Sequence, residues 1–212
     1  MNGSGATIEL VTTEALGDTS YLLVSGDEAA LVDPQRDSWG LIESCTGRGV
    51  RIRYVLETHV HNDYVSGALE VRAATGATVA APARAPYAFD HLAMAEDDEI
   101  SFGDVTVRAM ETPGHTAEHT AYLVFDGAQQ APSAVFTGGS LLVGNAGRTD
   151  LSGSHRTEEL AGPSTGPCGG SRCCRTPPGS CRRTERGVPA QPARSRGSGP
   201  PPWAPSGAPT PC

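Results

Sequence analysis

The chain has 212 residues, a formal net charge of −8 and no lysine, so every basic side chain is an arginine. This length allows one domain with a sizeable core, or one domain followed by a tail. Its acidic character argues against nucleic acid as a partner. No stretch approaches the ~18 apolar residues of a membrane span, and no segment resembles a signal peptide. Together with Cys45 as the lone cysteine before the tail, this predicts a cytoplasmic protein without a membrane partner.

The composition changes sharply near residue 160. Residues 1–160 hold nine arginines and 23 of the 24 acidic residues, a net charge of −14. Residues 161–212 hold seven arginines against one glutamate, a net charge of +6, with 12 of the 17 prolines and five of the six cysteines. Such a segment buries too little apolar surface to offset its ordering entropy. We predict a partial domain over 1–160 and a disordered tail over 161–212, either read in a shifted frame or a genuine extension of a shortened domain.

Short apolar runs separated by turn residues predict a chain rich in β-strands. Two helices are expected, over about 37–47 and over 66–76, where apolar residues recur at helical spacing. A further helix is indicated at 156–160, but the helical spacing of apolar residues does not continue after it. Strand runs with interspersed helices favour a layered α/β fold with the helices outside a sheet or sheet pair. The strands are expected over 6–12, 20–26, 28–34, 52–58, 78–81, 97–102, 104–111, 120–125 and 133–137.

The stretch ETHVHND (57–63) follows a strand expected to be buried and contains two histidines and an aspartate. His59, His61 and Asp63 alternate at i, i+2 and i+4, so a loop at this strand end can turn all three side chains toward one ion. Imidazole and carboxylate groups bind hard or borderline divalent metals, and imidazole suits zinc or iron. The spacing indicates a candidate metal site.

A second strand-end loop, ETPGHTAEHT (111–120), contributes His115 after a Pro-Gly turn. Two histidine loops at strand ends can meet at the same sheet edge, which strengthens the prediction of a metal site. For His119, four residues further on, a hydrogen-bonding or surface role is favoured over metal ligation. His91 and His155 are isolated in the sequence and are expected to be solvated.

These motifs, together with LVDPQRD (31–37) and FTGGSLLVGNAGRTDL (136–151), resemble the metallo-β-lactamase superfamily. Within it they are similar to persulfide dioxygenases and metallo-β-lactamase–rhodanese proteins. The resemblance runs from about residue 6 to Leu160. It implies an α/β architecture, the αββα sandwich, incomplete in this chain, and one Fe(II) held by two histidines and an aspartate. His59 and His115 match the two histidine ligands.

Two positions depart from the family pattern. The aspartate ligand of the family belongs to a TGD motif, and this chain reads Thr-Gly-Gly-Ser there, with Gly139 in the place of the carboxylate. The family's binuclear zinc hydrolases carry an HxHxDH motif, and this chain has Tyr64 at its last position. No histidine follows His155 to complete a second site. The resemblance therefore implies a single-metal centre rather than a binuclear zinc hydrolase.

The remaining candidate ligands are His59, His61 and His115, with Asp63 as a fourth ligand or as a residue that orients the others. Asp63 is also the candidate catalytic residue. Fe(II) is the favoured metal and Zn(II) the alternative. The resemblance implies oxidation of a low-molecular-weight thiol persulfide by O₂. The alternatives are a single-zinc thioester hydrolase of the hydroxyacylglutathione hydrolase type, and an inactive metal-binding remnant, because Gly139, Tyr64 and the tail leave enzymatic activity open.

Overall fold

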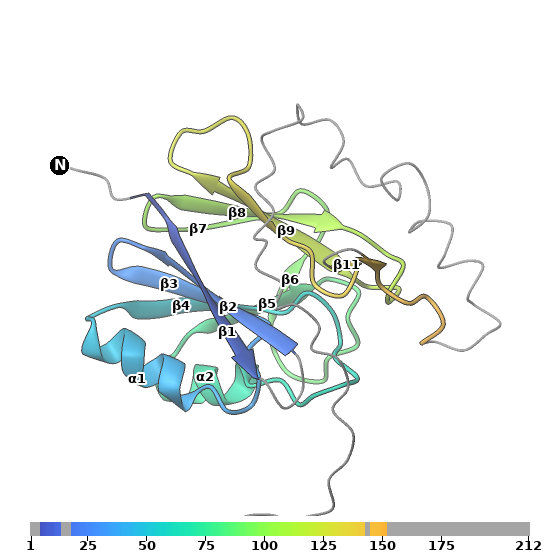
Figure 1. Ribbon diagram of the computed structural model, residues 1–212, viewed down its shortest axis with the longest axis horizontal. Helices are drawn as coiled ribbons and strands as arrows, with labels where there is room; N and C mark the ends of the chain where they lie inside the picture. Colours follow the sequence, from blue (N-terminus) through green and yellow to red (C-terminus); the bar gives the residue numbers. More distant parts are fainter. Residues whose placement is uncertain (1–4, 14–17, 143–144, 152–212) are drawn as a thin grey trace, which may run out of the picture.

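The computed structural model describes residues 5–13, 18–142 and 145–151. The helix expected at 156–160, the tail at 161–212 and His155 lie outside these residues. Within the described part, two β-sheets pack against each other, and two helices lie on the outer face of the larger sheet (Figure 1). This arrangement confirms the layered α/β fold expected from the sequence.

The larger sheet has the strand order β1-β2-β3-β4-β5-β6. Its first three strands are antiparallel neighbours, and β3, β4, β5 and β6 run parallel. The sequence predicted all of these strands except β6, which has three residues and too short a pattern to recognise. The strands are β1 (Thr7–Thr13), β2 (Asp18–Ser25), β3 (Glu28–Val32), β4 (Arg51–Leu56), β5 (Thr78–Pro82) and β6 (Leu92–Met94).

Both predicted helices are crossover connections between parallel strands, which cannot be joined by a tight turn. Helix α1 (Trp39–Gly47) connects β3 to β4, and α2 (Ala68–Thr75) connects β4 to β5. The α2 helix ends at Gly76, whose φ of 74° is left-handed and whose N–H donates to the carbonyl of Arg72. Glycine adopts this conformation without strain, which explains why the helix stops there.

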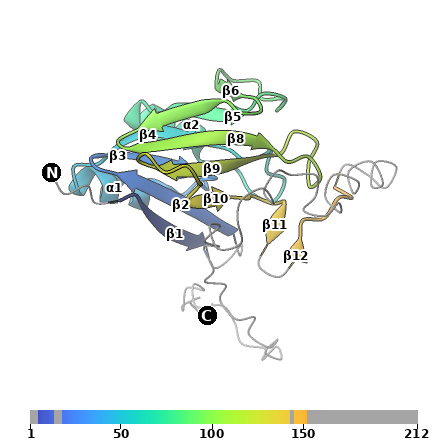
Figure 2. The ribbon, with the colours of Figure 1, turned by 90° about the horizontal axis from the view of Figure 1, so that it is seen from above.

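The smaller sheet is an antiparallel meander with the order β10-β9-β8-β7. The strands expected over 97–102 and 104–111 form a hairpin, β7 and β8, with Gly103 in its turn at a φ of 51°. Figure 2 shows the short pair β11 and β12, which the sequence did not predict, at one end of the molecule. The strands are β7 (Glu99–Phe102), β8 (Val105–Glu111), β9 (Thr120–Asp126), β10 (Ala134–Phe136), β11 (Leu141–Leu142) and β12 (Asn145–Ala146).

Alternate residues of the central strands enter two different hydrophobic cores. In β4, Val55 packs into the cluster under the helices, whereas Leu56 packs into the cluster between the sheets, and both side chains are fully buried. Leu22 and Leu23 of β2 divide in the same way. A strand covered on both faces is apolar throughout, which explains the continuous apolar runs in the sequence.

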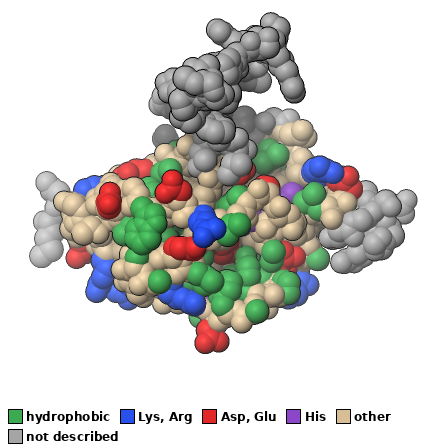
Figure 3. Space-filling view, turned by 90° about the horizontal axis from the view of Figure 1, so that it is seen from below, with side chains coloured by type: hydrophobic (Ala, Val, Ile, Leu, Met, Phe, Trp, Pro, Cys, Tyr) green, Lys and Arg blue, Asp and Glu red, His purple; other side chains and the backbone are tan. Residues whose placement is uncertain are grey.

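On the face shown in Figure 3, hydrophobic side chains are interspersed with arginines and acidic residues. Trp39 and Val65 are among the exposed large apolar residues of the described chain. None of the helices that the structure describes has the length and apolar content needed to cross a membrane.

The loops that follow β3 and β4 lie at one sheet edge, because parallel neighbours end on the same side. The loop between β8 and β9 joins them there. The Thr120 N–H donates to the carbonyl of Thr58 at 2.9 Å, and the Thr112 N–H donates to the carbonyl of His119 at 2.9 Å. The first bond attaches the second histidine loop to the first, and the other closes the second loop on itself.

Candidate metal centre

The structure brings the predicted histidines of both loops together. The ring centroid of His59 lies 4.2 Å from that of His61 and 4.9 Å from that of His115. His59 and His61 are nearly buried, whereas His115 is partly exposed. The expectation that two strand-end loops meet at one edge is therefore confirmed, and what each ring can bind depends on which of its nitrogens is already engaged.

Hydrogen bonds leave Nε2 as the free nitrogen of His59. The Thr58 hydroxyl donates to Oδ2 of Asp33 at 2.8 Å, so its proton is already used. The same hydroxyl lies 2.8 Å from Nδ1 of His59 and must accept a proton from that nitrogen. The Nε2 lone pair of His59 is then available to a metal ion. Burial lowers the pKa of His59 to about 4, which keeps the ring neutral at physiological pH.

The protein holds the His61 ring through Nε2, whereas it holds His59 through Nδ1. Its Nε2 lies 3.1 Å from Oδ1 of Asp33 and 3.0 Å from the hydroxyl of Tyr64, which itself donates to the Asp33 carbonyl. Nε2 therefore carries the proton that points to Asp33, and Nδ1 is left for a metal. A carboxylate on the far side of a histidine fixes the ring and raises its basicity. Burial opposes the charged ring, but the hydrogen bond and charge of Asp33 outweigh it and raise the pKa of His61.

His115 is oriented by the segment that carries the GRTDL motif. Its Nδ1 lies 3.1 Å from the carbonyl of Arg148, an acceptor only, so Nδ1 holds the proton and Nε2 is free. The Arg148 guanidinium makes two hydrogen bonds, of 2.8 Å and 3.0 Å, to the Asp150 carboxylate. The stretch 136–151 thus lies directly against a candidate ligand.

His119 is fully buried rather than on the surface. Its Nδ1 lies 2.7 Å from Oγ1 of Thr112, which agrees with the expected hydrogen-bonding role, and its Nε2 has no hydrogen-bond partner within the described residues. Burial lowers the pKa of His119 to about 3. His91 is partly exposed, and its Nδ1 lies 2.9 Å from the Phe89 carbonyl.

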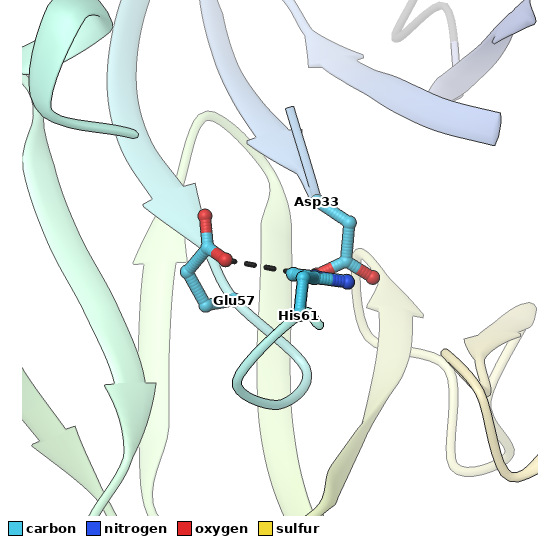
Figure 4. Close-up of side chains that lie close together, drawn as sticks. All are labelled: Asp33, Glu57 and His61. Carbon is cyan, nitrogen blue, oxygen red and sulfur yellow. Dashed lines mark hydrogen bonds and ion pairs between the residues drawn. The ribbon is translucent and has the colours of Figure 1, made fainter. Parts of the chain in front are cut away.

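Two buried carboxylates complete the site, and the sequence analysis did not single them out. Figure 4 shows Asp33 and Glu57 approaching His61 from two sides. Among the described residues, these are the three metal-binding side chains whose donor atoms all lie within 4.8 Å of one another. Both acidic residues directly follow parallel neighbouring strands, β3 and β4. This position at the ends of two adjacent strands is the sequence feature that could have identified Asp33 and Glu57 as site residues.

Asp33 functions as an orienting residue rather than as a ligand. It accepts hydrogen bonds from the Thr58 N–H, the Thr58 hydroxyl and His61, which occupy its carboxylate oxygens. Glu57 differs, because its Oε2 is buried without a hydrogen-bond partner in the described chain, while Oε1 accepts a 2.5 Å bond from Ser66. Burial, helped by the negative charge of Asp33, raises the pKa of Glu57 to about 8.

The remaining predicted positions lie around this cluster. The Asp63 side chain is 64 % exposed, and its Oδ1 lies 3.9 Å from Nδ1 of His61, the nitrogen left open by Asp33. Its role as a ligand or catalytic group stays a prediction. Tyr64 lies on the far side of His61, and burial raises the pKa of its hydroxyl, which stays protonated. Gly139 offers no donor atom from a side chain.

Among the described residues, the donor atoms that all lie within 4.8 Å of one another belong to Asp33, Glu57 and His61, and the three histidines do not form such a group by themselves. The free nitrogens of the histidines are Nε2 of His59, Nδ1 of His61 and Nε2 of His115, each on a ring whose other nitrogen is engaged by the protein. Such nitrogen donors suit zinc or iron.

Known proteins are similar to this chain in sequence and in fold. The sequence model of the metallo-beta-lactamase superfamily matches residues 14–175. A hydroxyacylglutathione hydrolase of Cereibacter sphaeroides is 36% identical over 146 residues, covering 66% of this chain and 55% of that protein. One from Acidiphilium cryptum is 35% identical over 120 residues, covering 56% and 49%. The chain thus spans about half the length of these curated relatives.

Two solved structures superimpose over most of the described fold. A metallo-beta-lactamase from Staphylococcus aureus gives a TM-score of 0.68 at 25% identity, covering 75% of this chain and 50% of that one. ETHE1 from Myxococcus xanthus gives 0.61 at 26% identity, covering 68% and 62%. Because the family model spans well over half of the sequence and the layers agree, this chain belongs to the metallo-β-lactamase superfamily.

Proposed function

We propose that this chain is a single-metal enzyme that oxidises a low-molecular-weight thiol persulfide with O₂, in the cytoplasm. The observation that carries the proposal is the contact between His115 and Arg148. The stretch 136–151, which resembles the persulfide dioxygenase branch, supplies the carbonyl that orients His115 and leaves its Nε2 free. This contact favours a role for the branch-specific motif in the metal site itself.

The reaction balances as persulfide, O₂ and water giving thiol, sulfite and two protons. The outer sulfur loses four electrons, and O₂ accepts them. Bound Fe(II) would supply the redox chemistry that O₂ requires. His59, His61 and His115 would hold the ion, and Asp33 and Thr58 would keep the first two rings in the tautomers that expose the correct nitrogen.

The experiment loads the full 212-residue chain with Fe(II) under anaerobic conditions and supplies glutathione persulfide and O₂. We expect one O₂ to be consumed for each sulfite formed. Arg148→Gln and Asp150→Asn, which break the bidentate pair behind the carbonyl contact, should lower this rate. Absence of O₂ consumption by the iron-loaded chain would overturn the proposal.

A second candidate is a zinc-dependent thioester hydrolase. It is favoured by the all-nitrogen donor set, since three histidines with an open position can activate water on zinc, and by the names of the curated relatives. The zinc-loaded chain would then hydrolyse an acylglutathione to acid and thiol without O₂. Tight metal binding with neither activity would instead favour the inactive remnant.

A further inference from the structure

The peptide unit that joins His59 to Val60 is bound at both of its polar groups by side chains from elsewhere in the fold. The Tyr87 hydroxyl donates to the His59 carbonyl at 3.0 Å. The Val60 N–H donates to Oε1 of Glu118 at 3.1 Å. Because a peptide unit is a rigid plane, its orientation sets the backbone angles on either side of it. The two candidate ligands His59 and His61 leave the backbone on those two sides.

Glu118 belongs to the loop between β8 and β9, which also carries His115. The Thr120 N–H at the end of that loop already binds the carbonyl of Thr58. The second loop therefore holds the backbone of the first loop both before and after His59. This pair of contacts sets the position of His59 relative to His115.

Tyr87 lies in the segment between β5 and β6, and its neighbours brace it. Its ring centroid lies 4.8 Å from that of Phe89 and 5.7 Å from that of His91. The Arg72 guanidinium of α2 stacks over the Phe89 ring at 5.8 Å and donates to the Asp90 carbonyl at 2.7 Å. The hydroxyl that binds the first histidine loop is therefore presented by a segment that is anchored to a helix.

We propose that Tyr87 and Glu118 are positioning residues that fix the plane of the His59–Val60 peptide unit and thereby hold His59 and His61 in the arrangement that binds the metal. Each residue acts through the backbone and not as a ligand. The inference rests on the metal site of the proposed function, and it holds for either candidate reaction.

Both contacts are needed because they act on opposite ends of one plane. Hydrogen bonds in series polarise one another, so the carboxylate at the N–H strengthens the bond at the carbonyl. A carboxylate acceptor also makes a stronger bond than a neutral one. When either contact is lost, the peptide unit is held from one side only and can rotate, which moves the rings attached beside it.

The zinc affinity of the full chain, measured by competition with a chromophoric chelator, tests the inference. Tyr87→Phe removes the hydroxyl and keeps the ring, and Glu118→Ala removes the acceptor. Each change should weaken zinc binding by about tenfold, as expected for the loss of a contact that orients metal ligands. Absorption of the Co(II)-substituted chain should shift in both variants, because the arrangement of the nitrogen donors changes.

Glu118→Gln separates the hydrogen bond from the charge. The glutamine carbonyl oxygen can accept the same bond from the Val60 N–H, so zinc affinity should stay within about twofold of that of the unaltered chain. The Co(II) spectrum should also be restored. A loss in Glu118→Gln as large as that in Glu118→Ala would overturn the positioning role, because the charge and not the contact would be responsible.

Two control variants lose contacts of the same kind elsewhere. Tyr122→Phe removes a 2.9 Å bond to the Glu57 carbonyl, but the Glu57 N–H stays bound to the sheet through the Ala80 carbonyl. Asp98→Ala removes a 2.8 Å bond from the Ala95 N–H. Both should lower the urea midpoint of the metal-free chain, while zinc affinity changes by less than about twofold.

Three results would overturn the inference. The first is unchanged zinc affinity and Co(II) absorption in Tyr87→Phe or in Glu118→Ala, because the inference requires both contacts. The second is an equal loss of zinc affinity in the two controls, which would trace the effect to stability. The third is failure of the unaltered chain to bind zinc, which would overturn the metal centre itself and is recognised without any assay of activity.

Discussion

The two loops that bring the histidines together are held in different ways. The loop after β4 is fixed by a buried network in which Asp33 receives hydrogen bonds from Thr58 and His61. The loop between β8 and β9 presents His115 through one hydrogen bond to the Arg148 carbonyl and leaves it partly exposed. In the first loop the candidate metal ligands also stabilise the fold. In the second loop His115 can be substituted with little loss of folding free energy.

Removing Asp33 should have the largest effect on the unfolding free energy, because the hydrogen bonds from Thr58 and His61 that fix the first loop all depend on its carboxylate. Asp33→Ala leaves His61 and Thr58 without their buried acceptor and should lower the unfolding free energy by about 3–5 kcal/mol. It also places alanine at a φ of 48°, which aspartate and asparagine tolerate better. Urea unfolding of the metal-free chain measures the loss.

Asp33→Asn is the matched control for this change. It preserves the shape and the left-handed backbone while removing the charge, so its loss should be smaller, about 1–3 kcal/mol. Equal stability of the alanine variant and the unaltered chain would show that the network does not support the loop.

The protonated Glu57 should make the first loop sensitive to pH. Its pKa is about 8 in the folded chain against an ordinary value of 4.5, so the folded state holds a proton that the unfolded state releases. The stabilisation is complete below pH 4.5 and is lost as the pH rises to about 8. Glu57→Gln should flatten this decline, as measured by thermal unfolding at pH 6.5 and pH 8.

Two histidines act in the opposite direction, over a pH range that overlaps the lower part of this one. The pKa values of His59 and His119, about 4 and about 3, lie under the ordinary 6.5, so their contribution to stability is present above pH 6.5 and is lost as the pH falls from 6.5 through those values. A Glu57→Gln chain that still loses the same stability between pH 6.5 and 8 would contradict the assignment of the effect to Glu57.

His115→Ala tests the second loop. Since the ring is partly exposed and makes one hydrogen bond, the unfolding free energy should fall by no more than about 1.5 kcal/mol. Zinc affinity should fall by more than about 100-fold, beyond the effect of losing an orienting contact. Calorimetric titration and urea unfolding measure the two effects, and unchanged zinc affinity would remove His115 from the metal centre.

Asp63→Asn should have the smallest effect on stability, within about 0.5 kcal/mol, because the side chain is largely exposed. If Asp63 is a ligand, zinc affinity falls with little loss of stability. An unchanged zinc affinity would mean that Asp63 is not a ligand and that the three histidines bind the metal without it.

Much of the fold could be predicted from local patterns. Strands such as β4 and β8 were expected near their observed bounds, because short apolar runs between turn residues mark strands, and both helices because their apolar residues recur at a spacing of about 3.6. The short strands β6 and β11 were missed, since two or three residues carry no readable period. The positions of the two histidine loops followed from their place at strand ends.

The sequence by itself determined the residue types available to the site: His59, His61, Asp63, His115, and a glycine where the family has a carboxylate. Only the tertiary structure decided that Asp33 and Glu57 join His61, that each ring has one free nitrogen, and that His115 lies against Gly139. The physical reason is that these contacts join strand ends and loops far apart in the chain. Hydrogen-bond direction and steric fit between such segments leave no periodic trace in the sequence.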